Sequence, residues 1–267
     1  MTTVSADGAE TRVWLRVGEI VLAGLVYFAL ARASLMFASL NASATPIWPP
    51  TGLAIALLLA RGNKLLPAIV LGAFAANFMT TPSVVTAAAI AIGNGLEAFV
   101  AALLLMRWAQ GERVFQSPIG VGKFALVVTA VAAPISATIG VSTLAATGYA
   151  QWSEFLAVWT TWWLGNLAGA ILAAPAIVLW MRTVRGEETR DFGLSTLLAF
   201  AAALAVAAIA LSPYSPVPSP SRGAIAFLVI LPLLWSALRL GLRETATMAL
   251  LISSFAVWGV VAGDSPF

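Results

Sequence analysis

The residues best suited to chemistry lie in three hydrophobic stretches that otherwise carry almost no polar groups. In AIAIGNGLEAFV (residues 89–100), Glu97 lies in the middle of a long apolar run, three residues after Asn94, so the two side chains share one helix face. A carboxyl group in such a segment is costly and therefore marks a candidate functional site. Three roles stay open for Glu97: a clamp between helices, either neutral or in an ion pair with Arg32; a ligand site; or a step in a proton pathway.

A second stretch, IWPPTGLAIALLLAR, is a hydrophobic run that is unusually short. Proline is tolerated in the first turn of a helix, so Pro49 and Pro50 are expected to begin a helix with Trp48 at its edge. The run to Ala60 spans ~18 Å, against a hydrocarbon core of ~30 Å. Either the preceding chain enters the membrane as non-helical backbone that lines a site, or the bilayer thins and neighbouring helices cover the helix ends.

The third stretch, WTTWWLGNLAG (residues 159–169), combines tryptophans with an amide. Either Trp162 or Trp163 falls on one helix face with Asn166. An aromatic wall beside an amide suits a planar or amphipathic ligand, whereas tryptophans near a membrane surface commonly serve as interfacial anchors or in packing. The predicted ligand-binding residues are Trp48, Pro49, Pro50, Asn94, Glu97, Trp162, Trp163 and Asn166.

The composition defines the protein class that must position these residues. Of 267 residues, 61% are hydrophobic and only 9% are charged, against about 25% charged in soluble domains. Continuous apolar runs predict an all-α polytopic membrane protein rather than a barrel. The absence of cysteine and histidine excludes disulfides, thiolate or histidine metal sites and a histidine base. With no catalytic motif in view, we expect no enzyme activity, no cofactor and no metal, and the basic loops do not indicate a nucleic-acid partner.

Nine hydrophobic segments organise the chain. Lys and Arg gather in alternate loops, which predicts a cytoplasmic N-terminus by the positive-inside rule. We expect a cytoplasmic tail over 1–16 and a membrane domain over 17–267, whose first segment is retained rather than cleaved as a signal peptide. Nine spans leave the chain end outside, so a continuation in the cytoplasm would require a tenth span beyond residue 267. The segments are 17–40, 48–60, 65–80, 84–106, 124–147, 154–181, 192–212, 224–238 and 244–262.

Several motifs, taken in order, resemble those of the first membrane-associated sensor (MASE) domain family. They are IWPPTGLAIALLL, GAFAAN, AIGNGLEA, PISATIG, WTTWWLGNLAG, PLLWSALRLG and the terminal GDSPF, over roughly residues 17–267. The family positions that match are Trp48, Pro49, Pro50, Gly52, Gly93, Asn94, Glu97, Trp162, Trp163, Gly165, Arg239 and Gly241. This chain departs from the family pattern at Asn166, where Asp is usual, and at Ser265, where the family ending has Gly.

The resemblance implies an integral-membrane input module of a bacterial signalling protein in the inner membrane. Its implied partners are the lipid bilayer, a small-molecule ligand of unknown identity and a cytoplasmic output domain, either a histidine kinase or a c-di-GMP enzyme, with homodimerisation possible. Two other function classes stay open. Short helices and an intramembrane carboxyl group also fit a small-molecule transporter or its substrate-binding component. A ligand-free membrane anchor or dimerisation scaffold is the third.

Overall fold

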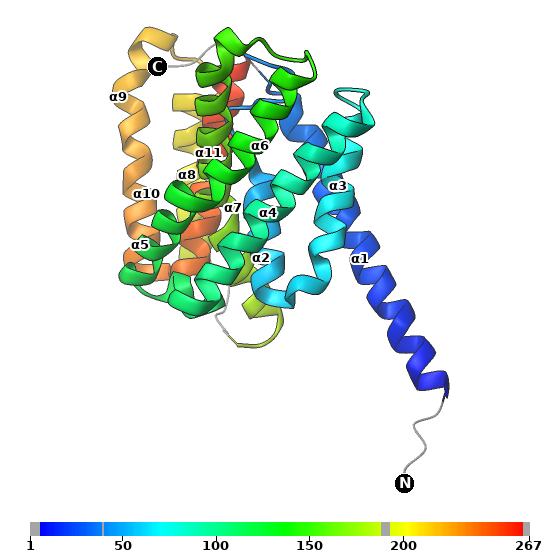
Figure 1. Ribbon diagram of the computed structural model, residues 1–267. Coiled ribbons are helices and arrows are strands. Elements are labelled where there is room, and N and C mark those ends of the chain that lie inside the picture. Colours follow the sequence, from blue (N-terminus) through cyan, green and yellow to red (C-terminus); the bar gives the residue numbers. More distant parts are fainter. Residues whose placement is uncertain (1–5, 39, 188–192, 264–267) are drawn as a thin grey trace. The chain divides into compact units, whose positions relative to one another are not determined.

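The computed structural model describes residues 6–38, 40–187 and 193–263, and within these ranges the chain is helical and contains no strand (Figure 1). Seven helical segments of the described chain are long and apolar enough to cross a membrane. Two further apolar helices, Pro49–Arg61 and Asn63–Phe78, are shorter. The expected all-α polytopic membrane protein is therefore confirmed, while the count of nine spans and the side of the N-terminus stay predictions. The seven segments are Val13–Leu35, Val84–Trp108, Pro118–Ala146, Trp152–Val184, Leu194–Leu211, Ser221–Leu240 and Leu242–Val261.

The chain forms two compact units that meet within one helix, at Ala170 and Ile171. The helices of the first unit are α1 (Ala6–Leu35), α2 (Pro49–Arg61), α3 (Leu66–Phe78), α4 (Val84–Trp108), α5 (Pro118–Val127), the π-helical turn η3 (Val128–Ala132), α6 (Ala133–Ala146) and the first part of α7 (Phe155–Val184), with short 3₁₀ turns η1 (Asn63–Leu65), η2 (Gly111–Gln116) and η4 (Trp152–Glu154). Those of the second unit are the rest of α7, α8 (Leu194–Leu211), α9 (Ser219–Ala226), the 3₁₀ turn η5 (Phe227–Val229), α10 (Ile230–Trp235), the π-helical turn η6 (Ser236–Leu240) and α11 (Leu242–Val261).

Within the first unit, α2 and α3 form a short hairpin. The turn passes through Gly62, whose φ of 75° is the left-handed conformation that glycine adopts most readily. The cations at this turn, Arg61 and Lys64, both contact the Glu19 carboxylate of α1, Lys64 at 3.1 Å. The α3 helix packs against both α1 and α4. The hairpin is thereby anchored at its turn by charge and along α3 by packing.

The segment from Pro118 to Ala146 contains a local change of helix type at η3. Pro134 lacks an N–H group, so a regular helix would leave a carbonyl without its partner at this point. The Ala133 N–H bonds the Val128 carbonyl five residues earlier, as in a π-helix. The Thr129 carbonyl then receives the Trp163 indole N–H at 2.9 Å. A proline-induced irregularity is thus satisfied by a tryptophan of α7.

Several predicted helix boundaries differ from those observed. The α1 helix begins at Ala6, within the predicted tail, and ends at Leu35, short of residue 40. The α5 helix begins at Pro118 rather than 124, because the Ser117 hydroxyl caps its first turn by accepting the Gly120 N–H. The stretch 212–223, expected to be a loop, becomes helical at Ser219. Residues 264–267 of the predicted terminal motif lie outside the described residues.

The second unit has a core built largely of small residues. Its buried members come from α8, α9, η6 and α11 and are Ala199, Ala203, Ala207, Ala210, Leu211, Ala226, Leu240, Met248 and Ile252. Alanines spaced three or four residues apart on α8 let neighbouring helices approach closely. One face of α8 is therefore committed to the protein interior, while Leu197 and Leu198 of the same helix remain exposed.

Candidate functional site

The chain that directly precedes α2 is non-helical, and most of its residues from Ser43 to Trp48 are buried in the protein. Its Trp48 N–H donates to the Gly165 carbonyl of α7 at 2.8 Å. Gly165 and Gly169 make this contact possible, since a Cβ on either residue would overlap the backbone carbonyl of Thr45 or Trp48. Non-helical backbone in a membrane protein is tolerated where protein buries it. Figure 1 shows α2 beginning from this segment.

Pro49 and Pro50 begin α2, as predicted, and suit the buried end of this helix. The first N–H groups of a helix have no partner within it, and a proline has no N–H to satisfy. The Thr51 N–H bonds the Trp48 carbonyl at 3.1 Å. The Thr51 hydroxyl, in the same first turn, donates to Glu97 Oε2 of α4 at 3.3 Å. The positive end of the α2 dipole therefore lies beside the carboxyl group.

Glu97 joins three helices through a single carboxyl oxygen. Besides the Thr51 hydroxyl of α2, the Asn166 amide of α7 donates to Oε2 at 2.9 Å. The Glu97 side chain is 1% exposed, and Oε1 has no hydrogen-bond partner among the described residues. The Tyr27 hydroxyl of α1 lies near the carboxyl group and Trp48. The carboxyl group thus links α2, α4 and α7 while one of its oxygens stays available.

A second chain of polar contacts lies next to Glu97. Trp162 Nε1 of α7 donates to the Ser136 hydroxyl at 3.2 Å, and Ser136 donates to Asn94 Oδ1 at 3.4 Å. The indole ring of Trp162 lies against Gly140, where a Cβ would come within 2.7 Å of the ring. The Asn94 amide also donates to the Ile90 carbonyl at 3.0 Å. The side chains of Trp162, Ser136 and Asn94 are buried, so their hydrogen bonds connect α7 to α6 and α6 to α4 inside the protein.

A small cavity adjoins the site. Its volume is about 10 Å³, which is about the space of one water molecule. Two of its lining groups, Ser43 Oγ and Trp48 Nε1, are buried without a hydrogen-bond partner among the described residues. Buried polar groups are normally paired, so a small hydrogen-bonding molecule would be stabilised here. The lining residues are Ser43, Thr45, Trp48, Asn77, Trp162 and Asn166.

The structure brings five of the eight predicted ligand-binding residues together: Trp48, Asn94, Glu97, Trp162 and Asn166. Pro49 and Pro50 shape the adjoining helix end. Trp163 points elsewhere: it stacks on Trp159 with ring centroids 5.8 Å apart and bonds the Thr129 carbonyl. The sequence did not single out Thr51, Ser43 or Tyr27, and only the position of Thr51 directly after the two prolines could have indicated it.

Arg32 does not form the expected ion pair with Glu97. Its guanidinium donates to the Thr80 hydroxyl at 2.9 Å, while Glu97 is held by neutral donors. Thr80 lies directly after the α3 helix, which ends at Phe78. Arg32 therefore connects the end of α1 to the residues that follow α3.

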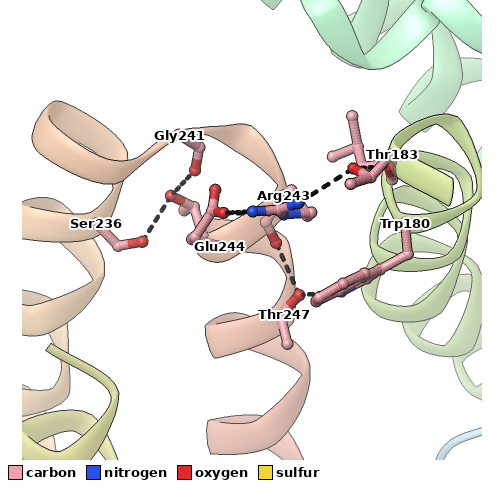
Figure 2. Close-up of polar contacts among 9 residues, drawn as sticks. Trp180, Thr183, Ser236, Gly241, Arg243, Glu244 and Thr247 are labelled. Carbon is pink, nitrogen blue, oxygen red and sulfur yellow. Dashed lines mark hydrogen bonds and ion pairs between the residues drawn. The ribbon is translucent and has the colours of Figure 1, made fainter. Parts of the chain in front are cut away.

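The second unit contains its own buried polar cluster, where α11 begins (Figure 2). Arg243 and Glu244 form an ion pair with side chains only 7% and 6% exposed. The Arg243 guanidinium also donates to the Thr183 hydroxyl at 3.2 Å and lies over the Trp180 ring at 4.8 Å. From the sequence, the cations of the loops indicated only the topology of the chain. The adjacency of Arg243 to Glu244 was the available signal for a buried pair.

The groups around Glu97 can form hydrogen bonds to a small polar molecule. They offer one free carboxyl oxygen, an amide already engaged with the carboxyl group and unpartnered donors at the cavity. The described chain places no group of three or more acidic residues that could hold a metal ion. Through Thr51 and Asn166, the same carboxyl group of Glu97 also contacts α2 and α7.

Comparison with known proteins gives one finding. The family model MASE1 matches residues 20–267. No curated protein and no solved structure matches the chain.

Proposed function

Because the chain belongs to the MASE1 family of membrane sensor domains, we propose that it is the membrane input module of a bacterial signal-transduction protein in the inner membrane. The proposed output is a histidine kinase or an enzyme of c-di-GMP metabolism. The observation that carries the proposal is the Glu97 carboxyl group, which links α2, α4 and α7 and keeps one oxygen without a partner.

A ligand can change a sensor only by binding one of its packings more tightly than another. At this site a ligand that donates to Glu97 Oε1, or competes with Asn166 for Oε2, alters the connection between α4 and α7. In a low-dielectric interior such an exchange is worth more than it would be in water. The proposed signal is therefore a change in how α2 and α7 are held to α4.

The cavity limits the class of ligand. With about 10 Å³ available, only a water-sized group enters without movement of the lining side chains. Trp48 Nε1 supplies a donor, whereas the Ser43 hydroxyl can donate or accept. We propose a small neutral molecule, or the hydroxyl end of a larger one, that both accepts and donates hydrogen bonds.

The test uses the protein encoded by the whole reading frame that contains this chain. Its output activity is measured in membranes for the wild type, Glu97→Gln and Asn166→Leu, with exposed Asn63→Ala as the matched control. We expect both site variants to hold the output at one level under conditions that change it in the wild type. An unaltered response in both variants would favour the scaffold, and solute uptake by proteoliposomes containing the protein would favour the transporter.

A further inference from the structure

We propose that the second unit binds an anionic phospholipid, with an acyl chain in a groove between α8 and α10 and the headgroup at Arg239. The proposal rests on residues of the second unit alone and does not depend on the function proposed for Glu97.

The groove is apolar and of ligand size. Its volume is about 610 Å³, within the roughly 300–1,000 Å³ typical of small-molecule sites. Its lining is hydrophobic except for one hydroxyl group, so a hydrocarbon chain suits it better than a polar solute. The lining side chains include Ser195, Leu198, Val206, Leu228, Leu231 and Trp235.

The length of the groove matches one leaflet of a bilayer. Along α8 it extends from Ser195 to Val206, which is ~16 Å at 1.5 Å per residue. Half of a ~30 Å hydrocarbon core is about the same. The α8 and α10 helices pack against each other (Figure 1). An acyl chain lying in the groove would therefore end near the bilayer midplane when its headgroup lies at the Ser195 and Trp235 end.

A cation lies at that end of the groove. The Arg239 guanidinium is 5.7 Å from the centroid of the Trp235 ring, which itself lines the groove. Arg239 is exposed, and the described part of the chain shows no acidic side chain paired with it. The neighbouring Glu244 is already paired with Arg243. An exposed guanidinium beside an apolar groove complements a phosphodiester with an attached acyl chain.

The local backbone holds Arg239 at this position. It lies in the π-helical turn η6, where the Gly241 N–H bonds the Ser236 carbonyl at 3.1 Å. Ser236 is buried, and its hydroxyl accepts from Thr245 at 3.0 Å. Single π-turns in helices occur frequently at functional sites. The Ser236–Thr245 hydrogen bond therefore joins the turn that carries Arg239 to α11, while the Arg239 side chain remains exposed beside Trp235.

The test is native mass spectrometry of the protein released from nanodiscs with equal phosphatidylglycerol and phosphatidylcholine. We expect retained phosphatidylglycerol to exceed phosphatidylcholine by about fivefold, the effect of one Arg near a headgroup. Arg239→Gln should abolish this preference, and Arg239→Lys should keep most of it. Exposed Arg107→Gln, at the end of α4, is the matched control and should leave the preference unchanged.

Photo-crosslinking locates the lipid. Phosphatidylglycerol with a diazirine in one acyl chain should label peptides 194–206 and 227–235. Ala202→Trp, which fills the groove, should remove the labelling, whereas Ala201→Trp beside it should not. Equal retention of the two lipids, an unchanged preference in Arg239→Gln, or labelling confined to other peptides would each overturn the proposal. The last result together with a dimer in the mass spectrum would mean that a second copy of the chain covers the groove.

Discussion

The contact between Asn166 and Glu97 gives the sharpest test of the site. Asn166→Leu removes the donor at 2.9 Å and leaves the buried Oε2 with only the Thr51 hydroxyl at 3.3 Å. A typical hydrogen bond contributes about 0.5–1.5 kcal/mol, and pairs inside membrane proteins average ~0.6 kcal/mol in mutant cycles. Because Asn166 is the nearer of the two donors to Oε2 and its loss leaves a buried acceptor poorly satisfied, we expect Asn166→Leu to lower the free energy of unfolding by about 1–2 kcal/mol.

A double-mutant cycle isolates the pair. Glu97→Met keeps much of the side-chain length but leaves the Asn166 amide and the Thr51 hydroxyl without their acceptor. Replacing both partners with apolar residues removes the unsatisfied groups, so the double variant Glu97→Met, Asn166→Leu should lose less stability than the two single variants together. We expect a coupling energy of about 1–2 kcal/mol for this pair. The longer Thr51 contact should give a smaller value in its own cycle with Glu97→Met.

The assay is reversible unfolding by sodium dodecyl sulfate in mixed micelles, followed by far-UV circular dichroism. Asn63→Ala, at an exposed position, is the control and should combine additively with Glu97→Met. A coupling energy below about 0.5 kcal/mol for Asn166 would refute the reasoning, since additivity to that level is expected of independent sites. So would a Thr51 cycle with the larger coupling, because the shorter contact would then not be the stronger one.

Three further variants test the packing with the same unfolding assay. Gly169→Ala should lower the free energy of unfolding by about 1–3 kcal/mol, because the added methyl group meets a backbone carbonyl. Gly122→Ala, where the added methyl group meets open space, should not lower it. Equal effects of the two substitutions would contradict the close approach at Gly169. Arg243→Met should lower the free energy of unfolding by about 3–5 kcal/mol, because it leaves the buried Glu244 unpaired. Adding Glu244→Leu should restore most of the lost stability. No restoration would be evidence against a stabilising Arg243–Glu244 ion pair. Trp163→Phe should lower the free energy of unfolding by about 1 kcal/mol, because it removes the indole donor to the Thr129 carbonyl. An unchanged unfolding midpoint would show that this hydrogen bond contributes nothing to stability.

The sequence predicted the helices well because their signals are local. Apolar runs, the double proline at the start of α2 and the glycine after α2 each act within a few residues. The errors in the predicted helix ends have local causes as well. Ser117 followed by Pro118 is a helix start that the basic composition of the neighbouring loop obscured. The polar stretch before Arg222 looked like a loop throughout, although its last residues begin α9.

The site was predicted in part, because spacing within one helix reveals less than packing between helices. The three-residue spacing of Asn94 and Glu97 placed both on one face, and both contribute to the buried network. The ion pair with Arg32, one of the alternatives for Glu97, does not form, because Arg32 contacts Thr80 and the sequence carries no information on which way α1 faces. The choice between Trp162 and Trp163 depended on Gly140 of another helix, which leaves room for one indole ring.

The shortness of α2 follows from the same packing. Its N-terminal end is buried because α7 has glycine at both positions, Gly165 and Gly169, where the preceding chain crosses it. Two prolines remove donors that this buried end would otherwise have to satisfy. The first free side chain after them, Thr51, then reaches Glu97. The short helix therefore begins beside the carboxyl group, where Thr51 of α2 and Asn166 of α7 both contact Glu97 of α4.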